Sequence, residues 1–342
     1  MSVDNDRVRN EQAPDAATLM QISTAYWESQ TLLTANRIGL FAVLADGPLG
    51  TERIARALGT ALRPTRLLLH ACVALGLLEQ SDEGFRNSRL SSDCLVPGGD
   101  RFLGDAIRYA DDLYTSWGRL EESLREGKPV LATELYTGES AERTRHFVYG
   151  MHNRALAVGQ VLTHLVDLTG RRRMLDIGGG PGTYSVLFVR RYPGLRATLM
   201  DLPAVVEIAG EIIAAMGAAD AVTRVAGDYL TDRFPAEQDV VLISGVFHRE
   251  TEENCRKLID AARASLCPGG MLVISDVFTD GSGVSPRFAT LFGLNMLLSA
   301  ADGGVHADMD VVKWLADAGF IGAQSRCFPP PMPHRVIQGV KS

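Results

Sequence analysis

The feature that most constrains this chain is a short apolar strand that runs into a glycine-rich turn, residues 174–183, Met-Leu-Asp-Ile-Gly-Gly-Gly-Pro-Gly-Thr. Glycine has no Cβ and readily adopts positive φ, so the backbone of such a turn can approach a ligand closely. A strand, a glycine turn and a helix in this order are typical of an open α/β sheet, which binds ligands at the carboxyl ends of its strands. We therefore expect a binding site for a nucleotide-like ligand at this turn.

Two common phosphate-binding motifs fit this turn poorly. Thr183 stands where the last glycine of the dinucleotide motif G-x-G-x-x-G should be. Pro181 lies inside the turn and has no N–H, whereas a pyrophosphate site depends on free backbone N–H groups. No Gly-Lys-Ser or Gly-Lys-Thr follows, so a Walker loop is excluded. The pattern thus disfavours a dinucleotide.

Polar residues follow the next predicted strands. A strand over residues 196–200 ends in Asp201, about 20 residues after the turn, where a carboxylate could accept bonds from the two hydroxyls of a ribose. A strand over residues 222–226 leads into Asp228. Residues 239–244 form an apolar run typical of a parallel strand that is covered on both faces. We expect these strands to deliver their polar residues to one edge of a sheet.

Four segments together resemble the class I S-adenosylmethionine-dependent methyltransferases. They are Leu-Asp-Ile-Gly-Gly-Gly-Pro-Gly-Thr at 175–183, Met-Asp-Leu-Pro at 200–203, Gly-Asp-Tyr at 227–229 and Cys-Pro-Gly-Gly at 267–270. Their order and spacing are similar to those of the small-molecule O-methyltransferases of plants and actinobacteria. The resemblance extends over about residues 15 to 340.

The resemblance implies an α/β fold with two domains and one cofactor. It implies an N-terminal, mostly α winged-helix dimerisation domain at 15–100, a helical linker at 101–165 that contributes to the acceptor pocket, and a Rossmann-like, seven-stranded catalytic domain at 166–342. The implied cofactor is S-adenosylmethionine. The residues expected to bind it are Asp176, Gly178, Gly179, Gly180, Asp201, Leu202, Asp228, Tyr229 and Ser244.

The first hundred residues predict a long helix over residues 16–44, two short helices and then a hairpin near residues 78–88. Two helices and a hairpin make a winged helix, which often binds DNA. Residues 47–95, however, carry six basic and five acidic side chains, and the whole chain has a net charge of −7. A DNA-binding domain should be clearly basic. We therefore expect no nucleic-acid partner, and the resemblance implies a homodimer formed through this domain.

Nothing in the sequence predicts secretion or membrane insertion. The five cysteines are odd in number and form no close Cys-x-x-Cys pair, so we expect reduced thiols. Residues 1–14 are polar and charged, unlike a signal peptide, and no apolar run reaches the length of a bilayer. We expect a cytoplasmic protein with no membrane partner.

The segment Val-Phe-His-Arg-Glu at 246–250 follows the fourth predicted strand and resembles the family segment Leu-His-Asp-Trp. This resemblance places His248 at the catalytic base, and histidine suits proton removal near neutral pH. Arg249 and Glu250 differ from the family, which has an aspartate and a tryptophan at these positions. The tryptophan of the family lies near the cofactor adenine, so this side of the site is altered.

Two further positions flank this histidine in the family, and the usual residue at each is glutamate. Here they hold Asp276, at the end of the fifth predicted strand, and His306. The resemblance thus implies a catalytic set of His248, Asp276 and His306. Two histidines and one carboxylate are also the ligands of a facial-triad metal site. A metal site stays open, but we favour the alternative without metal, in which His306 bonds the substrate or orients His248.

A helix near residue 150 and a later segment are expected to line the acceptor pocket. Met151 stands where relatives place a methionine against a planar acceptor, and a thioether suits an aromatic face. Met151 and Phe147, four residues apart, could equally form one core stripe. Arg154 could hold a carboxylate. The expected substrate-binding residues are Met151, His152, Arg154, Phe292, Asn295 and Met296.

Three functions remain open from the sequence. The first is O-methylation of a phenolic or enolic hydroxyl of a secondary metabolite such as an antibiotic intermediate, with His248 as the base. The second is C-methylation of an aromatic ring or of the carbon next to a keto group, since deprotonation makes carbon a competing nucleophile. The third is a non-catalytic protein that binds S-adenosylmethionine. The acceptor itself cannot be named, because fold-level resemblance does not transfer specificity.

Overall fold

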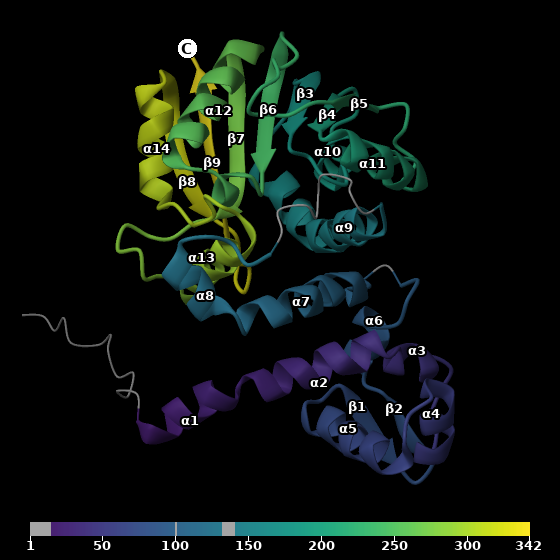
Figure 1. Ribbon diagram of the computed structural model, residues 1–342. Coiled ribbons are helices and arrows are strands. Elements are labelled where there is room, and N and C mark those ends of the chain that lie inside the picture. The colour runs from purple at the N-terminus through teal and green to yellow at the C-terminus, as the bar shows by residue number, and fades with distance from the viewer. Residues whose placement is uncertain (1–14, 100, 132–140) are drawn as a thin grey trace, which may run out of the picture. The chain divides into compact units, whose positions relative to one another are not determined.

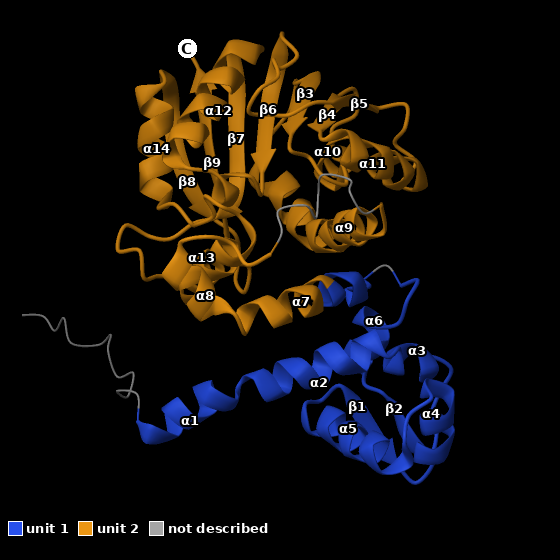
Figure 2. Cartoon of the chain, in the orientation of Figure 1, with its two compact units in different colours: residues 1–108 blue, residues 109–342 orange. Residues whose placement is uncertain are grey.

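The structure, a computed structural model, describes residues 15–99, 101–131 and 141–342. Its contacts divide the chain into two units, Met1–Arg108 and Tyr109–Ser342 (Figure 2). The domain boundary expected at residue 100 lies outside the described residues, and the division into three segments stays a prediction. None of the described helices combines the length and the apolar character needed to cross a membrane.

Unit 1 begins with three helices, so the single helix predicted over residues 16–44 is wrong. The three are α1 (Ala16–Thr24), α2 (Tyr26–Arg37) and α3 (Leu40–Val43). The hydroxyls of Ser23 and Thr24 both donate to the carbonyl of Met20, in competition with the helical backbone bonds. Gly39 has a φ of +78°, a left-handed conformation that separates α2 from α3.

The rest of unit 1 has the winged-helix order that the sequence predicts. Its elements are α4 (Thr51–Leu58), α5 (Leu62–Ala74), β1 (Leu78–Ser81), β2 (Gly84–Asn87) and α6 (Arg89–Cys94). The two strands pair antiparallel in a hairpin. Gly84 has a φ of +121°, and a Cβ there would lie 2.4 Å from the carbonyl oxygen of Leu49, so only glycine lets the hairpin approach that backbone.

Three helices precede the sheet of unit 2. They are α7 (Gly104–Trp117), which crosses the boundary between the units, α8 (Leu120–Glu126) and α9 (Ala141–Leu165). α9 packs against the first two helices of the sheet domain. A Cβ at Gly159 would lie 2.6 Å from Cδ1 of Leu187, so a glycine in mid-helix allows this close packing.

A seven-stranded sheet forms the centre of unit 2, in the order β5-β4-β3-β6-β7-β9-β8. The strands are β3 (Arg173–Ile177), β4 (Arg196–Asp201), β5 (Val222–Ala226), β6 (Gln238–Ser244), β7 (Leu266–Val277), β8 (Phe320–Cys327) and β9 (His334–Lys341). Only β9 is antiparallel to its neighbours, and it is paired on both sides. This is the Rossmann-like sheet expected from the sequence.

Helices cover both faces of the sheet, which explains why its central strands are apolar on both sides. They are α10 (Thr183–Arg191), α11 (Pro203–Ala215), α12 (Glu252–Ser265) and α14 (Asp308–Asp317), whereas α13 (Arg287–Ser299) packs against α8. In Figure 1, α10 and α11 lie beside β3 to β5, whereas α12 and α14 lie beside β6 to β9. Two large buried clusters of apolar side chains fill the space between the sheet and these helices.

The turn expected at residues 267–270 is an irregularity within β7. Gln238 pairs with Leu266 and Val240 pairs with Met271, so the four residues between them bulge out of the ladder. Gly269, with a φ of +74°, allows this bulge. It lies at the amino end of the strand, and the carboxyl ends of the parallel strands point the opposite way, towards α9 and α13 (Figure 1).

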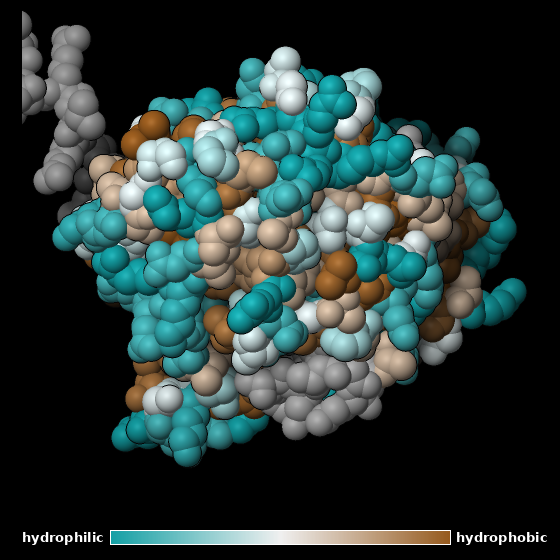
Figure 3. Space-filling view, turned by 90° about the horizontal axis from the view of Figure 1, so that it is seen from above, coloured by the Kyte–Doolittle hydropathy of each residue, from teal (hydrophilic) through white to brown (hydrophobic). Residues whose placement is uncertain are grey.

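Figure 3 views the molecule from above, where hydrophilic side chains surround scattered apolar ones.

Candidate active site

The glycine turn joins β3 to α10 and forms an open cradle of backbone. Gly178, Gly180 and Gly182 have φ values of +61°, +53° and +74°, which favour glycine. Gly178 is constrained a second time, because a Cβ there would lie 2.7 Å from Cγ2 of Val246. The cradle therefore depends on the absence of side chains, as the sequence suggests.

Asp176 lies beneath this cradle and is fully buried, with 0 % of its surface exposed. Its Oδ2 accepts a hydrogen bond of 2.7 Å from the hydroxyl of Ser185, whereas Oδ1 is buried without a partner among the described residues. A Cβ at Gly179 would lie 2.8 Å from Cγ of Asp176, so a glycine there leaves room for the carboxylate. Burial raises the pKa of Asp176 to about 7. A buried acceptor without a partner suggests that a ligand supplies the missing donor.

This raised pKa makes the stability of the ligand-free protein depend on pH. An ordinary aspartate has a pKa of 3.8, so the contribution of Asp176 to stability is present below that pH and is lost as the pH rises through about 7. Asp176→Asn, which cannot ionise, should gain stability over the wild type by at most about 1.4 kcal/mol per pH unit between pH 5 and 7. Urea unfolding of both proteins at pH 5, 6, 7 and 8 measures this difference. A difference that stays constant with pH would contradict it.

Asp201 ends β4 and closes the other side of the cradle. Its Oδ2 accepts from the backbone N–H of Gly180 at 2.7 Å, and its Oδ1 accepts from the N–H of Leu202 at 2.7 Å. Burial raises the pKa of Asp201, and the charge of Arg249 acts in the opposite direction. Each carboxylate oxygen has a second lone pair. Asp201 can therefore hold the loop and still accept bonds from two hydroxyls of a ligand.

The segment after β5 is bonded to the turn that carries the expected base. Asp228 is engaged locally, since its Oδ1 accepts from the N–H of Leu230 at 2.9 Å. The hydroxyl of Tyr229 donates to Oε1 of Glu250 at 2.7 Å, and Nδ2 of Asn254 donates to Oε2 at 2.9 Å. Burial, followed by the charge of Glu250, raises the pKa of Tyr229, which keeps the phenol a donor. Glu250, in the place of the family's tryptophan, is thus a buried and fully bonded carboxylate.

His248 lies in η2 (Phe247–Arg249), a single 3₁₀ turn that follows β6. Its Nδ1 lies 2.7 Å from Oδ1 of Asp276 at the end of β7, and its backbone N–H donates to Oδ2 at 3.3 Å. Burial alone raises the pKa of Asp276, but the charge of His248 and three hydrogen bonds hold it below the usual value. The edge of the Phe292 ring meets the imidazole, with the ring centroids 5.0 Å apart. The ionised carboxylate accepts from Nδ1, which leaves the lone pair on Nε2.

His306, expected in a set with these two residues, faces elsewhere. Its Nε2 lies 3.1 Å from the carbonyl oxygen of Phe247 and 3.0 Å from that of Glu250, and its ring packs edge-on against Trp314. The ring nitrogen therefore contacts both ends of the turn that carries His248 and does not face Asp276. In the part of the chain that the structure describes, no group of three or more His, Cys, Asp or Glu side chains is arranged to hold a metal ion.

These elements are those of a known family of enzymes. The family model of the O-methyltransferase domain matches residues 117–321, more than half of the chain. The chain belongs to the O-methyltransferase family. A second model, of the O-methyltransferase dimerisation domain, matches residues 20–97. The protein is thus an S-adenosylmethionine-dependent methyltransferase, and the alternative of a non-catalytic protein is set aside.

Several known proteins are similar to this methyltransferase over almost its whole length. It is 34% identical to a 3-hydroxy-5-methyl-1-naphthoate 3-O-methyltransferase of Streptomyces sahachiroi, over 95% of each chain. It is 32% identical to the tetracenomycin polyketide synthesis 8-O-methyl transferase TcmO of Streptomyces glaucescens, over 92% of this chain and 94% of TcmO. Among solved structures, human N-acetylserotonin methyltransferase in complex with SAM superimposes with a TM-score of 0.88 at 27% identity, over 97% of this chain and 99% of that one.

The residues of the cradle fit S-adenosylmethionine. The orphaned Oδ1 of Asp176 offers an acceptor to the ammonium group of the methionine part. Both oxygens of Asp201 remain available to the ribose hydroxyls, and Tyr229 flanks the same edge of the sheet. Ser244, at the end of β6, is bonded to Tyr184, whose pKa burial raises to about 12. The glycines leave the backbone open to the ligand.

On the acceptor side of the methyltransferase, α9 presents three of the expected residues. Met151 and His152 are half-buried, and Nδ1 of His152 lies 2.8 Å from the hydroxyl of Thr183 at the start of α10. The guanidinium of Arg154 lies 5.2 Å from the centroid of the Tyr109 ring. His152 thus contacts the cofactor loop, whereas Arg154 contacts an aromatic wall.

The expected residues of α13 have different surroundings. Phe292 stacks on Phe288 with a centroid distance of 5.9 Å, and its ring is also in edge contact with that of His248. Oδ1 of Asn295 accepts from the indole N–H of Trp117 at 2.9 Å. Met296 is only 4 % exposed, so it contributes to the core beneath the pocket.

His334, at the start of β9, is a residue that the sequence did not reveal. It pairs with Val277, directly after Asp276, so the register between β7 and β9 places it near the residue that bonds His248. The charges of Asp276, His248 and Arg154 all act on its imidazole. The sequence signal was only the proline-rich turn before it, because pairing between distant strands decides its position.

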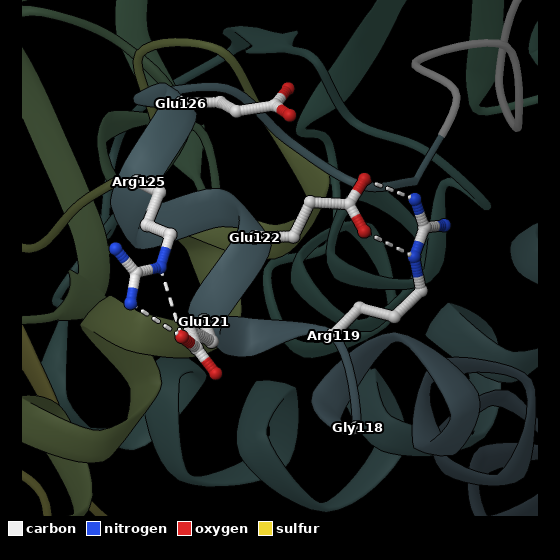
Figure 4. A pocket seen from close by; sticks show the side chains of 6 residues that line it. All are labelled: Gly118, Arg119, Glu121, Glu122, Arg125 and Glu126. Carbon is white, nitrogen blue, oxygen red and sulfur yellow. Dashed lines mark hydrogen bonds and ion pairs between the residues drawn. The ribbon is translucent and has the colours of Figure 1, made fainter.

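A hollow beside α8 contains no catalytic arrangement. The residues that line it are Gly118, Arg119, Glu121, Glu122, Arg125 and Glu126 (Figure 4). Arg119 pairs with Glu122 at 2.5 Å and Arg125 pairs with Glu121 at 2.7 Å, and all four side chains are exposed. Exposed pairs of this kind satisfy one another and contribute little energy.

Proposed function

We propose that this methyltransferase methylates a phenolic hydroxyl of a small aromatic secondary metabolite, with His248 as the general base. The observation that carries the proposal is the contact of 2.7 Å between Nδ1 of His248 and Asp276. It fixes the tautomer in which Nε2 can accept a proton, as in other His–carboxylate pairs. The relatives that act on a hydroxynaphthoate and on a polyketide support an aromatic acceptor.

The proposed mechanism divides the work between two sides of the site. S-adenosylmethionine supplies an electrophilic methyl group on a sulfonium. His248 removes the hydroxyl proton as the acceptor oxygen attacks, and Asp276 stabilises the imidazolium that forms. Asp176 and Asp201 orient the donor, while Phe292 and the residues of α9 orient the acceptor, because displacement at carbon requires an in-line approach.

Two further aspects belong to the proposal. Residues 20–97 match the dimerisation domain of the family, which supports a homodimer through unit 1. His306 supports catalysis indirectly, by bonding both ends of η2 and so fixing the position of His248. A cytoplasmic location agrees with the absence of membrane-spanning helices among the described residues.

Product analysis tests the proposed reaction. The purified protein is incubated with S-adenosylmethionine carrying a ¹³C-labelled methyl group and with a panel of phenols, hydroxynaphthoates and aryl keto acids. The expected product shows the ¹³C signal of a methoxy group. A C-methyl signal, which lies far from that of a methoxy carbon, would replace the proposal by C-methylation. Transfer to nitrogen, or no transfer to any hydroxylated aromatic compound, would also contradict it.

A further inference from the structure

Arg154 is a cation without a carboxylate partner among the described residues. Its guanidinium lies over the face of Tyr109, and the distance from the guanidinium carbon to the ring centroid is 5.2 Å. The side chain is accessible to solvent, yet the surrounding protein desolvates it enough to lower the pKa of the guanidinium. The guanidinium is thus partly desolvated and has no carboxylate among the described residues to neutralise it. An arginine at such a place usually has an anion to bind.

His334 carries an unpaired ring nitrogen, and the charge of Arg154 acts on its imidazole. Its Nδ1 is buried and has no hydrogen-bond partner among the described residues. Burial lowers the pKa of His334, the charges of His248 and Arg154 lower it further, and only the charge of Asp276 acts against them. The ring is held by its contact with Phe328, at a centroid distance of 5.6 Å. His334 is thus a neutral imidazole that faces two basic groups.

Among the described residues, the carboxylate whose charge acts on His334 is that of Asp276, and it is already engaged. Asp276 accepts from Nδ1 and the backbone N–H of His248 and from the N–H of Val277. It therefore offers little to Arg154 or His334. A guanidinium and a buried ring nitrogen remain, both of which can donate to an anion. Because His334 is close enough to feel both Arg154 and His248, an anion bound there would lie near the hydroxyl that His248 deprotonates.

We propose that the acceptor carries a carboxylate and that Arg154 binds it, with His334 donating a second hydrogen bond. The acceptor is then a hydroxylated aromatic acid whose ring lies between the aromatic side chains around Tyr109 and Phe292. A planar carboxylate matches the two parallel N–H groups of a guanidinium. This inference rests on the proposed function, since it concerns the second substrate of the same site.

Binding to the full-length protein saturated with S-adenosylhomocysteine tests the inference. The probes are pairs that share a ring, such as 3-hydroxy-1-naphthoate with 2-naphthol and 3-hydroxybenzoate with phenol, measured by titration calorimetry. We expect the wild type to bind at least one acid about tenfold or more tightly than its neutral partner, since bonds to charged groups contribute about 1.5–3 kcal/mol. Equal affinity for both members of every pair, or no binding of any acid, would overturn the inference.

Variants then assign the preference to Arg154. Arg154→Met keeps the aliphatic stem and should weaken the acid by about 10- to 100-fold while leaving the neutral probe unchanged. Arg154→Lys should recover part of the loss, because it keeps the charge without the planar fork. Arg145→Met is the matched control on the same helix, since Arg145 pairs with Glu211 on the surface, and it should behave as the wild type. Full acid affinity in Arg154→Met overturns the inference.

The results separate this inference from the proposed function. Unchanged affinity of Arg154→Met for S-adenosylhomocysteine shows that the variant is folded. An acid preference that depends on Arg154, with a product that carries no methoxy group, supports the anion site and contradicts O-methylation. A methoxy product formed equally from acids and neutral phenols supports O-methylation and overturns the anion site.

Discussion

His248→Ala is expected to lower kcat by about 10²–10⁴-fold, the range that a positioned general base contributes. The reason is the geometry of the pair, because Asp276 holds Nδ1 at 2.7 Å and leaves Nε2 to receive the proton. Alanine removes the acceptor of the proton and leaves Asp276 buried, 3 % exposed, without its partner. Steady-state methyl transfer to the acceptor found by product analysis measures the effect.

Two controls make this result specific to the base. Binding of S-adenosylmethionine, measured by calorimetry, should change little in His248→Ala, because the cradle is formed by other residues. His164→Ala replaces an exposed histidine on α9 that bonds only the carbonyl of Gln160 and the side chain of Arg191, and it should keep full activity. Transfer at the full rate by His248→Ala, with cofactor bound, would assign the proton to another group.

Asp201→Ala is expected to weaken binding of S-adenosylmethionine by about 100-fold or more. The ribose hydroxyls would lose the carboxylate that accepts their hydrogen bonds, and each hydrogen bond to a charged group contributes about 1.5–3 kcal/mol to binding. The substitution would also remove the hydrogen bond of 2.7 Å that Asp201 accepts from the N–H of Gly180, and this would loosen the glycine turn. Calorimetric titration with S-adenosylmethionine and with S-adenosylhomocysteine measures both effects together.

Further variants place the loss at this carboxylate. Asp201→Asn keeps the shape but replaces one acceptor oxygen by a donor, and it should weaken binding by an intermediate factor of about ten. Asp260→Ala removes an exposed carboxylate on α12 and should bind as the wild type does. Unchanged affinity in Asp201→Ala would show that the ribose is held elsewhere.

The strands of the sheet could be predicted closely from the sequence. The strand expected over residues 222–226 has those bounds, and the one expected over residues 196–200 extends by a single residue to Asp201. β4 is a largely buried strand that ends at Asp201, whereas β5 is an edge strand that is exposed except at Val222. Each strand could be placed because a charged residue or a glycine ends it. The prediction of one long N-terminal helix was wrong because local interactions interrupt the helix at two places. Hydroxyl groups at its first break and a left-handed glycine at the second outweigh a continuous apolar pattern.

The site was predictable only as far as chain position determines it. Asp176, Asp201 and His248 end or follow strands of known order, so the sheet alone brings them together. Motif similarity placed His306 near the expected base, but it could not reveal that the ring turns to the backbone carbonyls of Phe247 and Glu250. His334 was missed because the register between β7 and β9 carries it there, and register is a property of the folded sheet.

The bond between Tyr229 and Glu250 has a consequence for redesign of the enzyme. Tyr229 is one of the residues expected to bind the donor, whereas Glu250 adjoins the three-residue turn that carries His248. A smaller side chain at position 229 would make room for a larger sulfonium analogue. It would also remove one of the hydrogen-bond donors of the buried Glu250 carboxylate and so loosen the turn that carries His248. Substitutions at position 229 that admit a larger donor are therefore expected to lower turnover.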